Sequence, residues 1–322
     1  MHIRDRAIIS VLSLVLIALM AAVVGPTLSQ GEAQPTPLSS QAPLRPYVEG
    51  VVGSASSVGP FAARSVVERE ITALLFRGLV RLGPNAELVG DLADRWSVNE
   101  SGSEWTFHLR AGLAWQDGAP LTSADVVFTI RTLSDPAYAG PGAASWREVT
   151  ATAPDPQTVM LGLATPLGGF LQAATQPIAP EHLLGGIDPA ALPSESFGQQ
   201  PVGSGSFRLT LLDASHALLL RHVSGPAAAD GEGSETSAPA TDSLRSASPL
   251  VPGSIVYPYL DGIDLRFFAD EGALAAAWDL GELDGAAGVP AETAARFVSD
   301  GNSRVLRYPS NTLFDVTLNL RP

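Results

Sequence analysis

The chain has 322 residues, which at about 100–200 residues per domain is enough for two domains. It contains neither cysteine nor lysine, which excludes disulfides, thiolate metal sites, a cysteine nucleophile, a lipid-modified cysteine, a Schiff-base lysine and a P-loop lysine. The formal net charge of −14 has the wrong sign for a general nucleic-acid-binding protein, because such proteins present a basic face to the phosphates.

The N-terminus carries an apolar run, Ala7–Val24, behind Arg4 and Arg6. Its 18 residues include only two polar side chains, both serines, and are just long enough for a helix to cross a hydrocarbon core of about 30 Å. Residues 1–24 are therefore predicted to be a cleaved signal peptide or an uncleaved transmembrane anchor, with the two arginines on the cytoplasmic side. Residues 25–46 are rich in proline and serine, and we expect them to form an extended tether between the membrane and a folded domain.

The ordered part of the pattern begins with a strand predicted at Tyr47–Val52, followed by a turn of small residues at Gly53–Pro60. Next, Ser65 and Glu68 have the spacing of a capping box, in which the two side chains bind the first free amides of a helix. The helix itself is predicted from four apolar residues at helical spacing, namely Ile71, Leu74, Leu75 and Leu79.

Asp91 and Asp94 open a helix-like run, and Trp105–Arg110 then alternates apolar and polar residues as a half-buried strand does. Thr122 and Asp125 form a second capping box at the start of another helix. The remaining predicted elements are strands at 158–163, 207–211, 217–221 and 263–267 and an alanine-rich helix at 269–280.

Strands mixed with helices and joined by turn-rich segments indicate an α/β or α+β body. Residues 224–252 interrupt this order, because they are rich in small and polar residues and have almost no large apolar side chain before Leu244. We expect them to be a flexible surface insertion.

Motifs of several enzyme classes are missing from the sequence, which has no G-x-S-x-G, H-E-x-x-H, Walker A or G-x-G-x-x-G. Gly203–Ser206 fails the dinucleotide pattern because it enters a strand rather than a helix. None of the five histidines has metal-ligand spacing with a carboxylate partner, so no metal, cofactor or catalytic residue is predicted. A secreted hydrolase with paired carboxylates, Asp91 with Asp94 or Asp117 with Asp125, stays open as an alternative on spacing alone.

Three blocks carry the most specific pattern in the chain: ELVGDLADRWSV at 87–98, WTFHLRAG at 105–112 and WQDGAPLTSADVVF at 115–128. Further blocks follow in order at 177–184, 201–208, 258–267 and 281–285. In order and spacing, these blocks together resemble the family 5 extracellular solute-binding proteins, which are the peptide- and nickel-type receptors of ABC importers.

The resemblance implies an α/β fold of the type II periplasmic-binding-protein kind, with two lobes, over residues 47–322. It implies an extracytoplasmic protein that binds a peptide or similar small solute by closure of the lobes and delivers it to ABC transporter permease subunits. Membrane contact would be made through residues 7–24, and no nucleic acid, cofactor or enzymatic activity is expected.

The loop Ser54–Pro60 is the predicted solute contact in this part of the chain, because Ser54, Ser56 and Ser57 offer hydroxyls and free amides. Phe61, directly behind the loop, completes the predicted ligand-binding set. An ordinary serine-rich turn fits the same residues equally well.

The resemblance departs from the family pattern at three points. Members in cells with a single membrane are usually held by a lipidated cysteine, which residues 7–24 would replace as an anchor. The insertion 224–252 falls where members usually run more directly into the next strand. Residues 313–322 resemble the strand that crosses into the second lobe, so we expect only lobe I and the start of lobe II. These departures keep open a second interpretation, a membrane-anchored interaction module derived from this family that no longer binds solute.

Overall fold

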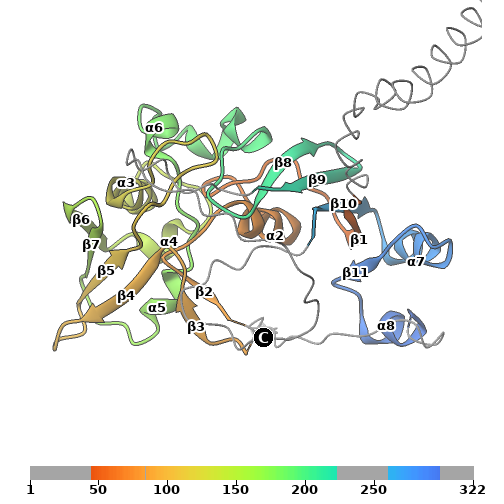
Figure 1. The fold of residues 1–322 in the computed structure, drawn as a ribbon. Helices are drawn as coiled ribbons and strands as arrows, with labels where there is room; N and C mark the ends of the chain where they lie inside the picture. The colour runs from red at the N-terminus through yellow and green to blue at the C-terminus, as the bar shows by residue number, and fades with distance from the viewer. Residues whose placement is uncertain (1–44, 84, 223–259, 298–322) are drawn as a thin grey trace, which may run out of the picture. The chain divides into compact units, whose positions relative to one another are not determined.

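The computed structural model describes residues 45–83, 85–222 and 260–297 (Figure 1). The predicted export segment at 1–24, nearly all of the tether, the insertion at 224–252 and the crossing strand at 313–322 lie outside these residues. None of the helices within the described ranges combines the length and the hydrophobicity that crossing a bilayer requires.

The described elements alternate between strands and short helices along the chain. The strands are β1 (Tyr47–Val52), β2 (Val80–Leu82), β3 (Leu88–Gly90), β4 (Ala93–Val98), β5 (Glu104–Leu109), β6 (Val149–Asp155), β7 (Thr158–Leu163), β8 (Phe207–Leu212), β9 (His216–Arg221), β10 (Gly262–Phe268) and β11 (Gly285–Ala287). The helices are α2 (Val66–Leu75), α3 (Ser123–Ser134), α4 (Ala143–Trp146), α5 (Phe170–Ala173), α6 (Glu181–Leu184), α7 (Glu271–Asp279) and α8 (Ala291–Phe297), with 3₁₀ turns η1 (Leu192–Ser194) and η2 (Ser196–Gln199).

A five-stranded sheet in the order β11-β1-β10-β9-β8 contains the first strand of the described chain (Figure 1). Strand β1 lies parallel to β10 on one side and to β11 on the other, whereas β9 is antiparallel to both β10 and β8. The parallel register pairs Tyr47 with Ile263 and Val52 with Phe268, so β1 and β10 end at the same edge of the sheet.

The two faces of this sheet are covered by different helices. Val51 belongs to the main buried core together with Val67 and Ile71 of α2. A side chain at Gly50, on the opposite face, would come within 3.4 Å of Leu274 of α7. Helices α2 and α7 therefore pack on opposite faces of the strands that precede them.

A second sheet, in the order β4-β5-β7-β6, is antiparallel throughout and packs against α3. Its buried face includes Phe107 and Val159, both fully buried, and the Trp105 and Phe107 rings stack at 6.3 Å. The short hairpin β2–β3 connects α2 to this sheet along the chain.

Most of the predicted elements are confirmed, including the β1 strand and both capping boxes. The helix-like run after Asp91 and Asp94 was wrong, because this segment forms β4, in which Trp96 pairs with Phe107 of β5. Cross-strand pairing with an aromatic partner outweighs the local helical pattern there.

The helix predicted through Leu79 ends at Leu75 instead, and Leu79 is buried outside it. The backbone carbonyl of Leu75 accepts hydrogen bonds from the amides of Ser204 (3.0 Å) and Gly205 (2.8 Å), which satisfy the end of the helix. Phe76 then adopts an extended backbone conformation, so the chain leaves the helix at this point.

Candidate functional site

The ends of β1 and β10 form an edge at which the chain leaves toward opposite faces of the sheet, since α2 follows β1 and α7 follows β10. The amide of Gly53 donates to the carbonyl of Phe268 at 2.9 Å and holds the two strand ends together. In open α/β sheets, ligands bind outside the carboxyl ends of the strands at such a switch point. We call residues 53–65 and 269–270, which follow the two strands, the switch edge, and it is the candidate site.

Glu68 organises the first segment of the switch edge. Its carboxylate accepts hydrogen bonds from the backbone amides of Ser56 (3.1 Å), Arg64 (2.8 Å) and Ser65 (2.9 Å) and from the Ser56 hydroxyl (3.2 Å). Ser56 lies near the start of the loop, whereas Arg64 and Ser65 lie at its end. One side chain of α2 therefore holds both ends of the loop, in addition to its part in the capping box with Ser65.

Two opposing effects set the charge of Glu68. Burial raises the pKa of this carboxyl, but the hydrogen bonds from Ser65, Ser56 and Arg64 outweigh it and lower the pKa to about 2. Glu68 is therefore a carboxylate at neutral pH and over most of the acidic range.

Two further carboxyls lie on the facing surfaces of β1 and α2. Burial, and secondarily the charge of Glu70, raises the pKa of Glu49 above its ordinary value. Burial also raises the pKa of Glu70. Glu49 and Glu70 therefore lie close enough for the charge of one to act on the other, and Arg69 partly offsets the effect of burial on Glu70.

The structure places the four predicted ligand-binding residues in different environments. Ser54 is exposed, and its side chain makes no hydrogen bond within the described residues. Ser56 is exposed, but its amide and hydroxyl are both bound to Glu68. Ser57 is half-buried with its hydroxyl against Gly198, and Phe61 is 3% exposed and packs edge-on against Tyr138 at 5.7 Å. Of the four, Ser54 offers an unengaged hydroxyl at the surface.

Sequence reasoning missed two exposed apolar side chains beside Ser54. Val52 ends β1 and is 38% exposed, and Val66 begins α2 and is 60% exposed. Exposed apolar side chains at the ends of the two elements that adjoin a free hydroxyl suit a solute with apolar and polar groups. The signal in the sequence was an apolar residue directly before the small-residue turn and another directly after Ser65, which opens the capping box.

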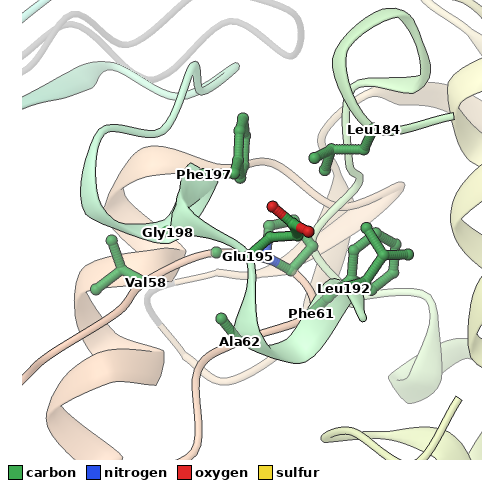
Figure 2. Close-up of a pocket in the computed structure, with 10 residues that line it drawn as sticks. Val58, Phe61, Ala62, Leu184, Leu192, Glu195, Phe197 and Gly198 are labelled. Carbon is green, nitrogen blue, oxygen red and sulfur yellow. The ribbon is translucent and has the colours of Figure 1, made fainter. Parts of the chain in front are cut away.

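A small cavity lies beneath the second half of the loop (Figure 2). Residues 58–62 form one wall and side chains between Leu184 and Gly198 form the other, joined by a hydrogen bond from the Val58 amide to the Gly198 carbonyl at 2.8 Å. The cavity measures about 10 Å³, which is room for about one water molecule. It brings predicted residue Phe61 together with Glu195, which sequence reasoning did not single out.

The far end of α2 is held by a glycine-rich segment. Gln116 is buried, and its side-chain amide donates to the carbonyls of Gly205 (3.1 Å) and Phe207 (2.7 Å). A Cβ atom on Gly203 would lie 2.2 Å from the carbonyl oxygen of Leu75. The glycine is thus required by close backbone approach, and the segment enters a strand, as predicted.

The carboxylates of the hydrolase alternative have structural partners. Asp91 binds Arg77 at 2.6 Å, and Asp125 accepts the amides of Thr122 and Glu181. Asp117 lies 2.8 Å from the imidazole of His182, a pairing across 65 residues that the sequence spacing did not suggest. Within the described ranges, no group of three or more histidine or acidic side chains is arranged to hold a metal ion.

A comparison with known families decides where this fold belongs. A sequence profile for bacterial extracellular solute-binding proteins, family 5 (middle region), matches residues 87–322. The chain belongs to this family. The resemblance of the three sequence blocks is confirmed.

The chain is also similar to individual members of the family. The glutathione-binding protein GsiB of Escherichia coli K12 is 25% identical over 278 residues, which are 85% of this chain and 48% of GsiB. The structure is similar to NikZ from Campylobacter jejuni in complex with Ni(L-His), with a TM-score of 0.65 and 20% identity over 81% of this chain and 46% of NikZ. It is also similar to the oligopeptide-binding protein AppA from Bacillus subtilis in complex with a nonapeptide, with a TM-score of 0.64 and 19% identity over 80% of this chain and 47% of AppA.

These likenesses confirm the predicted fold, that of the type II periplasmic binding proteins. The chain spans about half the length of the curated relatives and solved structures that it matches.

Proposed function

We propose that this family 5 protein is the solute-binding component of an ABC importer and that it works outside the cytoplasmic membrane. Residues 1–24 direct its export or anchor it, and permease subunits receive the solute. The family match over 87–322 is the observation that carries this proposal.

The proposed solute is a peptide or a related small molecule. The names and titles of similar proteins mention glutathione, a nickel–histidine complex and a nonapeptide, all of which contain amino-acid groups. The switch edge supports this class, because it offers the exposed Ser54 hydroxyl, exposed valines at the adjoining ends of β1 and α2, and a loop that Glu68 holds in place before any ligand arrives. Binding takes place by closure of two lobes around the solute, with a few hinge residues absorbing the change in backbone conformation.

The proposal is tested by thermal unfolding of the full chain with glutathione, with a nonapeptide pool and with nickel plus histidine. A ligand at one hundred times its dissociation constant is expected to stabilise the folded protein by about 2.7 kcal/mol and to raise its melting temperature. A protein that melts cooperatively and responds to none of these solutes contradicts the proposed class. A folded chain that binds no solute would instead favour the anchored interaction module, which no longer binds solute.

The Ser54→Ala variant is expected to weaken binding of the responsive solute about fivefold, because one hydrogen bond contributes about 1 kcal/mol. Isothermal titration calorimetry measures this change. Ser97→Ala, which removes an exposed hydroxyl from β4 in the other sheet, is the matched control and should leave the affinity unchanged. Equal affinities for both variants would remove Ser54 from the site.

A further inference from the structure

The cavity beneath the switch-edge loop holds one charged side chain among apolar ones. Figure 2 shows the carboxylate of Glu195 pointing into the space between Phe197 and Leu184, with Leu192 and Phe61 close by. Glu195 is half-buried, and within the described residues its carboxylate has no hydrogen-bond donor and no arginine or histidine partner.

A half-buried carboxylate in such a lining loses part of its hydration without receiving a compensating bond. A cationic donor beside the carboxylate would compensate for the lost hydration, because hydrogen bonds between ionised groups are stronger than those between neutral groups. The two phenyl rings in the lining, Phe61 and Phe197, are also compatible with a cation, since aromatic rings attract positive charge at their faces.

The size of the cavity limits what can enter. About 10 Å³ is room for one water-sized group, and among organic cations the head of a primary ammonium group comes closest to that size and can donate to a carboxylate. We propose that this cavity is a binding site for a primary ammonium group, with the Glu195 carboxylate as its acceptor. The amine is either a small free alkylammonium ion or the amino group of a larger solute.

The site is distinct from the exposed surface around Ser54, because residues 58–62 line it from the underside of the same loop. Its existence does not depend on the importer proposal. If it is occupied by the amino group of a peptide, the two sites lie on one loop and the ammonium group fixes the orientation of the solute.

The test is a titration of the full chain with methylammonium chloride, followed by nuclear magnetic resonance of the backbone amides, against sodium chloride at the same ionic strength. The amides of Val58, Gly59 and Gly198 are expected to shift with methylammonium and not with sodium. Glu195→Gln should weaken methylammonium binding about tenfold, because it removes the charged acceptor at nearly constant volume. The matched control Glu181→Gln changes an exposed glutamate on α6 and should retain the response.

Tetramethylammonium, which carries the same charge but has no N–H group to donate to Glu195, provides a second measurement on the unaltered protein if Glu195→Gln fails to fold. Equal shifts with methylammonium and tetramethylammonium, or no shift with either, would overturn the proposal. So would an unchanged response in folded Glu195→Gln.

A second arm distinguishes the two sources of the amine. A peptide that binds equally well with a free or an acetylated amino terminus, while methylammonium still shifts the three amides, identifies the site as one for a free amine. If methylammonium binds and none of the solutes named under the proposed function does, the ammonium site stands and the proposed solute class fails. If peptides bind and methylammonium produces no shift, the reverse holds.

Discussion

Glu68→Ala is expected to lower the free energy of unfolding by about 3 kcal/mol, because it leaves the amides of Ser56, Arg64 and Ser65 without their acceptor. Glu68 is only 7% exposed, so water does not readily take over these hydrogen bonds. Denaturant unfolding of the full chain measures the loss. Solute affinity should fall as well, because the loop then has to be ordered on binding.

The contribution of Glu68 also predicts how stability depends on pH. Its pKa in the folded protein, about 2, lies below the ordinary value of 4.5. The stabilisation is therefore fully present above about pH 4.5 and is lost as the pH falls toward 2, by about 2 kcal/mol once solvent screening is allowed for. In Glu68→Gln, the free energy of unfolding should therefore fall less steeply between pH 5 and pH 2.5 than it does in the unaltered protein.

Glu148→Gln, an exposed glutamate after α4, is the matched control and should change stability by no more than about 0.5 kcal/mol. If the free energy of unfolding falls equally steeply with pH in Glu68→Gln and in the control, other carboxyls are responsible for the pH dependence. A Glu68→Ala protein as stable as the control would contradict the role of Glu68 in holding the loop.

Gly203→Ala is expected to destabilise the protein by about 3 kcal/mol, mainly because its methyl group would lie 2.2 Å from the carbonyl oxygen of Leu75. This carbonyl ends α2 and accepts the amides of Ser204 and Gly205, so relieving the clash separates the helix from the segment that caps it. Thermal unfolding would detect the loss of stability, and limited proteolysis would detect the separation of the capping segment from α2.

The control for this change is Gly168→Ala, since a Cβ atom at Gly168 meets no other atom within 4 Å. Its stability should stay within about 0.5 kcal/mol of the unaltered protein. If Gly203→Ala has the same melting temperature as this control, the close approach at Leu75 relaxes at little cost in free energy.

Local interactions were predictable from the sequence. The capping boxes at Ser65 and Thr122 join residues three apart, so their geometry depends on a single turn of chain. The strand at Glu104–Leu109 was predictable because alternation with a period of two reports which face is buried. The family was recognisable for a related reason, since its signature blocks consist of these short capped, turning and alternating units.

Contacts between distant parts of the chain were decided by the tertiary structure. The segment after Asp91 became a strand because β5 offered an aromatic partner for Trp96, and α2 stopped at Leu75 because residues 204 and 205 supplied its final hydrogen bonds. The pairing of Asp117 with His182 and the cavity between Phe61 and Glu195 likewise join residues more than sixty positions apart.

The composition excluded chemistry that needs a thiol or a lysine, and the net charge excluded a general nucleic-acid-binding protein. The motifs determined the family. Those conclusions depend on which residues are present and on their short-range order. The engagement of Ser56 by Glu68, the burial of Phe61 and the free hydroxyl of Ser54 depend on which groups meet after the chain has folded. Only the packed structure decides that, because a hydrogen bond made within the protein is no longer available to a ligand.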